Sequence, residues 1–152
     1  FLWIGFVCID ALIVDRGVKR IILYDGVCNF CNKWVDTVLS LDSKNLFKFA
    51  ALQSETGKHL LEYIGKRSND LSSVIYIRSL DPSPDFYTKS DAALKVAEDL
   101  GIPRFLTLTV SKLIPNVVRD KVYDIVASNR YNILGKREEC SCGDSNYSDK
   151  FL

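Results

Sequence analysis

Two cysteines, Cys28 and Cys31, stand three residues apart where a predicted strand passes into a predicted helix. Cysteines at this spacing can form a disulfide, because one helical turn brings their side chains together. The start of a helix also offers unpaired N–H groups and the positive end of the helix dipole, which stabilise a thiolate. The pattern therefore predicts a redox-active dithiol in which Cys28 is the better nucleophile.

Such a dithiol implies exchange chemistry in two steps. The Cys28 thiolate attacks a substrate disulfide and forms a mixed disulfide, and Cys31 then attacks the Cys28 sulfur and releases the reduced substrate. In the reverse direction the same pair oxidises a dithiol. We therefore expect a disulfide- or dithiol-containing protein or small molecule as partner, and no cofactor.

Asp25 ends the predicted strand three residues before Cys28. A carboxylate in this place can act as a general base for the inner thiol, Cys31. It can equally cap the helix or shape the turn that it forms with Gly26. We name Asp25 as a candidate catalytic residue, and both interpretations stay open.

An alternation of strands and helices positions these residues. Short apolar runs predict strands at residues 21–24, 46–52, 74–77 and 86–88, the last two antiparallel. Amphipathic spacing predicts helices at residues 29–41, 54–65, 90–101, 103–113 and 116–128, with Ser54 and Ser90 as N-caps. The fold class is therefore α/β, with a β-α-β-α-β-β-α core and a C-terminal helical extension.

The motifs resemble those of the DCC family of thiol-disulfide oxidoreductases. Residues 24–28 with Cys31 match its Asp-Gly-x-Cys-x-x-Cys signature. The resemblance continues in order at residues 90–94, 114–115, 119–120, 123–124, 129–131, 135–136 and 140, and so covers roughly residues 19–140. It implies a thioredoxin-like fold and a dithiol-based redox role. Glutathione or a thioredoxin-type protein is a candidate electron donor for such a role.

One departure from thioredoxins concerns substrate recognition. Thioredoxins place a cis-proline before the third strand, where its backbone receives the substrate, whereas residues 70–73 here contain no proline. The Asn29-Phe30 pair between the cysteines also differs from the Gly-Pro of thioredoxin and the Gly-His of strongly oxidising relatives. A thioredoxin-like mode of substrate binding therefore does not follow from the resemblance.

Ser90 and Asp91 begin a helix that starts near the active site in thioredoxin-like folds. Glutaredoxins and glutathione transferases use such residues to hold glutathione, whose carboxylate suits a helix start, although plain capping explains them as well. Arg119 shares a helix face with Tyr123 and Arg130, and an arginine directed at the dithiol would stabilise a thiolate. Ser90, Asp91 and Arg119 are candidate substrate-binding residues, and they support an alternative function: a glutathione-linked enzyme that uses Cys28 alone.

A second alternative is an interaction module without catalysis. Cys140 and Cys142 could join Cys28 and Cys31 in a zinc site, although the gap between the pairs is unusually long for structural zinc. They could also form a second redox pair or lie in a mobile tail. We expect no metal, and we assign no catalytic role to His59, the only histidine.

Composition and charge set the remaining limits. The 152 residues carry a net charge of +1 with scattered basic residues, so we expect no nucleic-acid partner. Residues 1–17 are an apolar leader or truncated segment that is too short for stable membrane insertion. Residues 18–135 form the domain, and residues 136–152 a polar, mobile tail.

Five cysteines suit a reducing compartment, so we expect an intracellular location, in the cytoplasm, a plastid or a mitochondrion.

Overall fold

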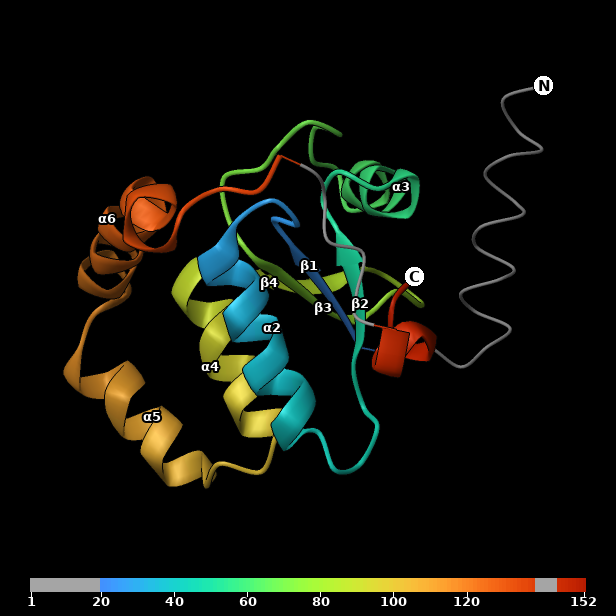
Figure 1. The fold of residues 1–152 in the computed structure, drawn as a ribbon. Helices are drawn as coiled ribbons and strands as arrows, with labels where there is room; N and C mark the ends of the chain where they lie inside the picture. The colour runs from blue at the N-terminus through green and yellow to red at the C-terminus, as the bar shows by residue number, and fades with distance from the viewer. Residues whose placement is uncertain (1–19, 139–144) are drawn as a thin grey trace.

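A four-stranded sheet forms the centre of the computed structural model, which describes residues 20–138 and 145–152 (Figure 1). The strands are β1 (Ile21–Tyr24), β2 (Lys48–Ala51), β3 (Ile75–Ser79) and β4 (Asp85–Thr88). They lie in the order β2-β1-β3-β4. The β1 strand pairs in parallel with β2 and antiparallel with β3, and β3 pairs antiparallel with β4 as predicted.

Helices cover both faces of this sheet. They are α2 (Asn29–Leu41), α3 (Glu55–Tyr63), α4 (Lys89–Asp99), α5 (Arg104–Leu113) and α6 (Asn116–Leu134), followed by the short 3-10 helix η1 (Ser145–Lys150). The helices α2 and α4 pack on one face, and α3 packs on the other (Figure 1). The order β-α-β-α-β-β-α with C-terminal helices confirms the predicted α/β fold, which is consistent with a thioredoxin-like architecture.

The β1 strand shows why an apolar run without polar alternation becomes a central strand. All four of its side chains are fully buried. Successive side chains of a strand point to opposite faces, so Ile22 and Tyr24 pack under α2 and α4, while Ile21 and Leu23 pack against α3. Each such burial contributes about 1.5–3 kcal/mol, which fixes β1 beneath the dithiol.

The start of α3 confirms the predicted cap and explains a close packing contact. The Ser54 hydroxyl accepts a hydrogen bond from the N–H of Gly57 at 3.0 Å. A Cβ at Gly57 would lie 2.1 Å from the carbonyl oxygen of Ala51. Glycine at this position therefore lets α3 approach β2 closely.

The predicted cap of the next helix is wrong. The α4 helix begins at Lys89, whose backbone is left-handed (φ 53°), and no side chain caps it. Ser90 lies in the first turn instead, where its hydroxyl donates to the carboxylate of Asp120 on α6. The Ser90 hydroxyl therefore forms a tertiary hydrogen bond to α6, and not the N-cap hydrogen bond that the local sequence predicts.

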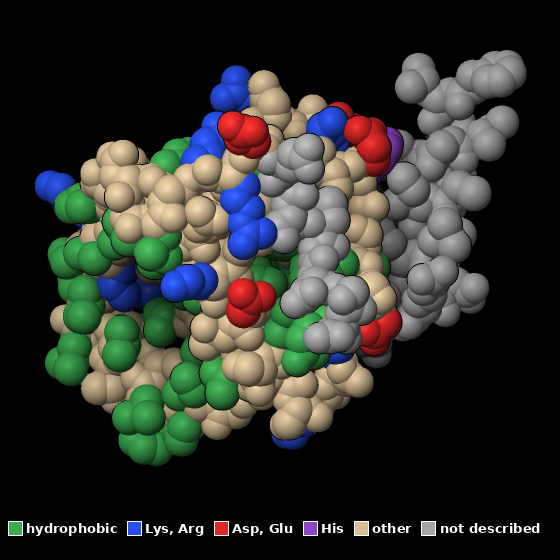
Figure 2. Space-filling view, in the orientation of Figure 1, with side chains coloured by type: hydrophobic (Ala, Val, Ile, Leu, Met, Phe, Trp, Pro, Cys, Tyr) green, Lys and Arg blue, Asp and Glu red, His purple; other side chains and the backbone are tan. Residues whose placement is uncertain are grey.

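The C-terminal helices leave much apolar surface uncovered. The only α5 side chain that is buried is Thr107, which donates to Glu98 of α4. Hydrophobic side chains gather over α5 and the start of α6 at the left of Figure 2, and the most exposed are Phe105, Leu113 and Val117. The α6 helix also runs to Leu134, six residues beyond the predicted end, because Tyr131 packs against the core.

The last residues of the chain pack against the free edge of β2. The N–H of Leu152 donates to the carbonyl of Phe49 at 2.8 Å, and the rings of Phe49 and Phe151 lie 5.6 Å apart. Residues 1–17, Cys8, Cys140 and Cys142 lie outside the described residues, and the predicted domain boundaries stay predictions. Within the described chain, no helix has the length and apolar character needed to cross a membrane.

Candidate functional site

The turn between β1 and α2 positions the dithiol. The N–H of Cys28 donates to the carbonyl of Asp25 at 3.2 Å, and Cys28 becomes the N-cap of α2 with an extended backbone. Its sulfur accepts a hydrogen bond from the N–H of Cys31 at 3.2 Å. The Cys28 sulfur therefore lies at the positive end of the helix, as its place in the sequence predicts.

The two cysteines differ in environment. Both are free and buried, with Cys28 0% and Cys31 8% exposed. Burial raises the pKa of the Cys31 thiol above its usual value, and a hydrogen bond to Cys28 and the negative charge of Asp25 raise it further. Cys31 thus keeps its proton at neutral pH, which favours Cys28 as the nucleophile.

Residues 134–137, which we name the strap, pass over the start of α2. The N–H of Asn29 donates to the carbonyl of Gly135 at 3.3 Å, and the N–H of Arg137 donates to the carbonyl of Val27 at 2.7 Å. Cys28 and Lys136 form an isolated antiparallel bridge. The strap therefore contributes to the complete burial of Cys28, which the sequence did not indicate.

The side chain of Asn29 strengthens this attachment. Its amide nitrogen donates to the carbonyl of Leu134 at 3.0 Å, and its amide oxygen accepts from Nε of Arg137 at 2.7 Å. Asn29 stands between the two cysteines in sequence and directly follows Cys28. One residue of the Cys-x-x-Cys motif thus connects the dithiol to the end of α6.

Asp25 is the centre of a buried polar cluster. It is 3% exposed, and its carboxylate accepts hydrogen bonds from the backbone of Val27 at 3.2 Å and from Gln53 at 2.6 Å. Arg130 forms an ion pair with it at 3.2 Å, and the Tyr131 hydroxyl also donates to it. These contacts satisfy the carboxylate that lies nearest in sequence to the dithiol.

Arg130 is the arginine that the structure directs at the site. It reaches from α6 to Asp25 and also donates to the carbonyl of Leu71 at 3.0 Å. Its positive charge lowers the pKa of Cys31, although burial outweighs this effect. Arg130 is predictable from the helix face that it shares with Arg119 and Tyr123. The residue pattern does not predict Gln53 or Tyr131, and the only signal for Tyr131 is its place in the family motif at residues 129–131.

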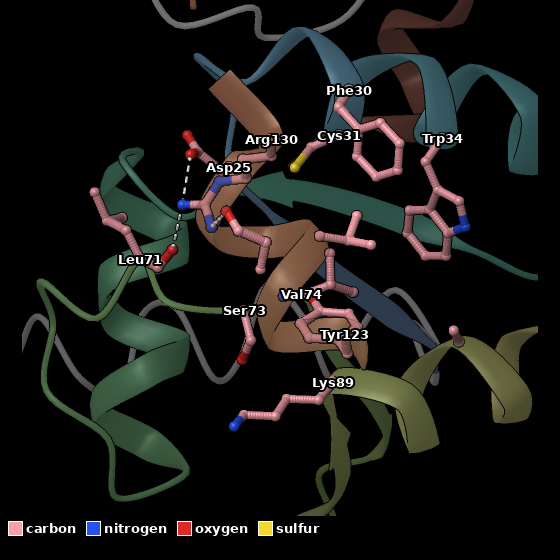
Figure 3. A pocket seen from close by; sticks show the side chains of 13 residues that line it. Asp25, Phe30, Cys31, Trp34, Leu71, Ser73, Val74, Lys89, Tyr123 and Arg130 are labelled. Carbon is pink, nitrogen blue, oxygen red and sulfur yellow. Dashed lines mark hydrogen bonds and ion pairs between the residues drawn. The ribbon is translucent and has the colours of Figure 1, made fainter. Parts of the chain in front are cut away.

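A cavity of about 250 Å³ opens beside Cys31 (Figure 3). Residues from the turn after β1, from α2, α4 and α6, and from the segment before β3 line it: Asp25, Phe30, Cys31, Trp34, Leu71, Ser73, Val74, Lys89, Ala93, Tyr123, Val126, Ala127 and Arg130. Most of these side chains are apolar. Cys31 forms part of its wall, and Cys28, one helical turn earlier, does not.

The segment that lacks the thioredoxin proline lies at this cavity. Leu71, Ser73 and Val74 line it together with Cys31. The carbonyl of Leu71 accepts from Arg130, and the N–H of Val74 donates to the Tyr123 hydroxyl at 3.0 Å. Side chains of α6 therefore already form hydrogen bonds with the backbone groups that would otherwise pair with an extended peptide substrate.

Ser90, Asp91 and Arg119 come together, but with one another and not with the dithiol. Arg119 pairs with Asp91 at 3.0 Å and is 8% exposed, and Ser90 donates to Asp120. None of these four side chains lines the cavity beside Cys31. Their contacts join the start of α4 to α6, and their role in substrate binding stays a prediction.

A metal site is not formed by the described residues. No three His, Cys, Asp or Glu side chains in that part of the chain lie close enough to hold a metal ion. Cys140 and Cys142, which the zinc hypothesis requires, lie outside it. That hypothesis is therefore untested by the geometry.

Comparisons with known proteins point to one family. The sequence model of a family described as DCC1-like thiol-disulfide oxidoreductase matches residues 22–136. The uncharacterized protein YuxK of Bacillus subtilis (strain 168) is 39% identical over 135 residues, which cover 88% of this chain and 94% of that protein. The DCC family protein At1g52590, chloroplastic, of Arabidopsis thaliana is 40% identical over 126 residues, 83% of this chain and 71% of that protein. No solved structure matches the chain at a significant level.

Proposed function

The chain belongs to the DCC1-like thiol-disulfide oxidoreductase family, and from this premise we propose that it exchanges thiols and disulfides through Cys28 and Cys31. The observation that carries the proposal is the hydrogen bond from the Cys31 N–H to the Cys28 sulfur at 3.2 Å. A sulfur that receives an N–H at the positive end of a helix is stabilised as a thiolate, which is the reactive form.

In the first step, the Cys28 thiolate attacks one sulfur of a substrate disulfide. A bond forms between Cys28 and that sulfur, the substrate S–S bond breaks, and the second substrate sulfur leaves as a thiolate. The buried Nε of Arg130, which lines the same cavity as Cys31 and has no partner among the described residues, can donate a hydrogen bond to the leaving thiolate.

In the second step, Cys31 resolves the mixed disulfide. It loses its proton, attacks the Cys28 sulfur and releases the substrate as a second thiol, so two electrons and two protons pass from the protein to the substrate. We propose that the Asp25 carboxylate accepts the Cys31 proton, with Arg130 and Tyr131 holding it in place. In the opposite direction, the disulfide form oxidises a dithiol by the same steps.

Access to Cys28 requires a local movement, because this residue is 0% exposed. Two backbone hydrogen bonds and the contacts of Asn29 hold the strap over it. Local opening of such a short segment costs less than global unfolding. We propose that the strap opens to admit the substrate, so the burial of Cys28 slows the reaction without preventing it.

The partners that fit this proposal are disulfide- or dithiol-containing molecules, with glutathione or a thioredoxin-type protein as electron donor. We propose an intracellular site of action. A chloroplast fits the name of the Arabidopsis relative, while the cytoplasm and the mitochondrion remain the other predicted locations.

The proposal is tested with the full chain in which Cys8, Cys140 and Cys142 are replaced by serine. This background, once reduced, is treated with hydroxyethyl disulfide, and the products are identified by mass spectrometry. We expect a reversible Cys28–Cys31 disulfide, and loss of the reaction when Cys28→Ser is added. A background protein that keeps both thiols while free cysteine reacts would contradict the proposal.

A further inference from the structure

The cavity beside Cys31 carries information about the substrate. Its walls come from three helices, the turn after β1 and the segment before β3, and Phe30, Trp34 and Val74 give it an apolar surface (Figure 3). Transfer of apolar surface from water into such a site is favourable by roughly 25 cal/mol per Å². The lining therefore favours a molecule with an apolar body.

The charges in the lining are already paired. Lys89 forms an ion pair with Asp124 at 3.0 Å, and Arg130 forms one with Asp25 at 3.2 Å. A charged ligand would lose its hydration here and gain no unpaired counter-charge from the lining residues. The cavity therefore disfavours glutathione disulfide, which carries several charges, and favours an uncharged molecule.

The size of the cavity and its backbone contacts favour a small molecule over a peptide. Its volume of about 250 Å³ exceeds the roughly 150 Å³ of a protein cavity that accepts benzene. An extended peptide binds by hydrogen bonds to exposed backbone groups. Here the carbonyl of Leu71 and the N–H of Val74 are already bonded to Arg130 and Tyr123.

One polar group of the lining remains without a partner. The buried Nε of Arg130 has no hydrogen-bond partner among the described residues. A buried donor without an acceptor is costly, so a ligand that brings one acceptor next to it is stabilised. A carbonyl oxygen or a sulfur that gains negative charge would serve, and neither requires a charged ligand.

We propose that this cavity binds a small, uncharged disulfide with an apolar body, such as a dithiolane ring on an alkyl chain, and holds its S–S bond at the Cys31 end. This inference rests on the proposed exchange function and adds the class of substrate. Once the strap opens as proposed above and exposes the Cys28 sulfur, which is buried in the resting state, Cys28 forms a mixed disulfide with one ring sulfur, and the other ring sulfur leaves as a thiolate. Cys31 then closes the Cys28–Cys31 disulfide and releases a dithiol, so electrons and protons balance.

The test compares three disulfides on the reduced protein whose other three cysteines are serine. Lipoamide is uncharged and apolar, hydroxyethyl disulfide is small and polar, and glutathione disulfide is charged. Second-order rates of Cys28–Cys31 disulfide formation are measured by acid quench and mass spectrometry. Each rate is divided by the second-order rate at which the same disulfide oxidises free dithiothreitol, which corrects for the intrinsic reactivity of that disulfide. We expect the corrected rate with lipoamide to exceed that with glutathione disulfide at least about 10-fold, a difference of 1.4 kcal/mol in barrier.

A variant that fills the cavity separates binding there from general reactivity. Ala93 of α4 is exposed and lines the cavity, so Ala93→Phe reduces its volume with little effect on the core. Ala97→Phe, one turn later on the same helix and outside the lining, is the matched control. We expect Ala93→Phe to lower the lipoamide rate about 10-fold, which corresponds to 1.4 kcal/mol, and Ala97→Phe to leave that rate unchanged.

The outcomes distinguish the two proposals. If no disulfide oxidises the dithiol and the Cys28–Cys31 disulfide oxidises no added dithiol, the exchange function itself fails. If all three react with equal corrected rates, or if Ala93→Phe and Ala97→Phe slow all three equally, exchange stands and the cavity is not a substrate site. Octanamide, an uncharged alkyl amide without sulfur, should compete with lipoamide, and absence of competition would also overturn the inference.

Discussion

At the scale of single residues, Asp25 is the group whose role decides the mechanism. Its carboxylate accepts hydrogen bonds from Gln53 and Tyr131 and forms an ion pair with Arg130. All three residues come from segments that are distant from Asp25 in the sequence. Its negative charge raises the pKa of Cys31. A carboxylate can therefore act here in two opposite ways: its charge keeps the proton on Cys31, while its oxygen can accept that proton during resolution.

The Asp25→Asn variant separates these two effects. Loss of the charge alone would make Cys31 more acidic and speed the resolving step. Loss of a proton acceptor would slow it by a factor of about 10²–10⁴, typical of general-base catalysis. We expect slower resolution, measured as release of a chromogenic thiol from the Cys28 mixed disulfide near neutral pH, with recovery as hydroxide increases. Resolution as fast as wild type or faster would contradict the role of Asp25 as proton acceptor.

Folding must be controlled in this experiment. Removing one partner of a buried ion pair costs about 3–5 kcal/mol, so Asp25→Asn is compared with the double variant that adds Arg130→Gln. Asp42→Asn, at the other end of α2 and also buried, is the matched control. It should leave the resolving rate unchanged.

At the scale of elements, α2 and the end of α6 act on the dithiol together. The start of α2 offers its N–H to the Cys28 sulfur, and the strap at residues 134–137 covers the same turn. Gly135 permits this path because its φ of 87° is favourable only for glycine. The reactivity of Cys28 should therefore depend on how firmly the strap is attached.

Loosening the strap should expose Cys28. Arg137→Ala removes the hydrogen bond from Arg137 to Asn29, and such a bond contributes about 0.5–1.5 kcal/mol. We expect the alkylation rate of Cys28 by iodoacetamide to rise about 2–10-fold, measured by peptide mass spectrometry. Arg67→Ala, at an exposed arginine outside the strap, is the control. An unchanged rate at Cys28 in Arg137→Ala would show that other elements control its access.

At the scale of the whole molecule, the sequence predicts what depends on local pattern. The order of strands and helices, the Ser54 cap and the helix start at Cys28 all follow from neighbouring residues, and the structure confirms them. The Asp25 cluster does not follow, because Arg130 and Tyr131 lie more than 100 residues away from it. The strap and the cavity likewise depend on where α6 packs against α2 and α4, which periodicity does not specify. The cap predicted at Ser90 fails for the same reason, because the Ser90 hydroxyl donates instead to Asp120, 30 residues away in the sequence.

Burial of titratable groups makes the stability of the whole fold depend on pH. Burial raises the pKa of Cys31 and of Tyr76 above their ordinary values of 9.0 and 10.0. Both groups are neutral when protonated, and the folded chain keeps their protons to higher pH than the unfolded chain. Their contribution to stability is therefore complete below about pH 9 and is lost as the pH rises above these values.

We expect the free energy of unfolding, measured with urea, to fall between pH 8.5 and pH 11. Tyr76→Phe should flatten this fall, even though it loses the hydrogen bond to Asp99 and about 1.5–3 kcal/mol at neutral pH. Tyr63→Phe, at a more exposed tyrosine, serves as the control and should leave the slope unchanged. An equal slope in Tyr76→Phe and wild type would exclude Tyr76 as a source of the alkaline instability.

The most direct test of the central claim is to identify the cysteine that forms the mixed disulfide. The single variants Cys31→Ser and Cys28→Ser, both in the background without the other three cysteines, are treated with the same small disulfide at neutral pH. Peptide mass spectrometry then locates the adduct. The account predicts a stable adduct on Cys28 in Cys31→Ser, and none, or a far slower one, on Cys31 in Cys28→Ser. An adduct that forms readily on Cys31 and not on Cys28 would contradict the assignment of Cys28 as the nucleophile.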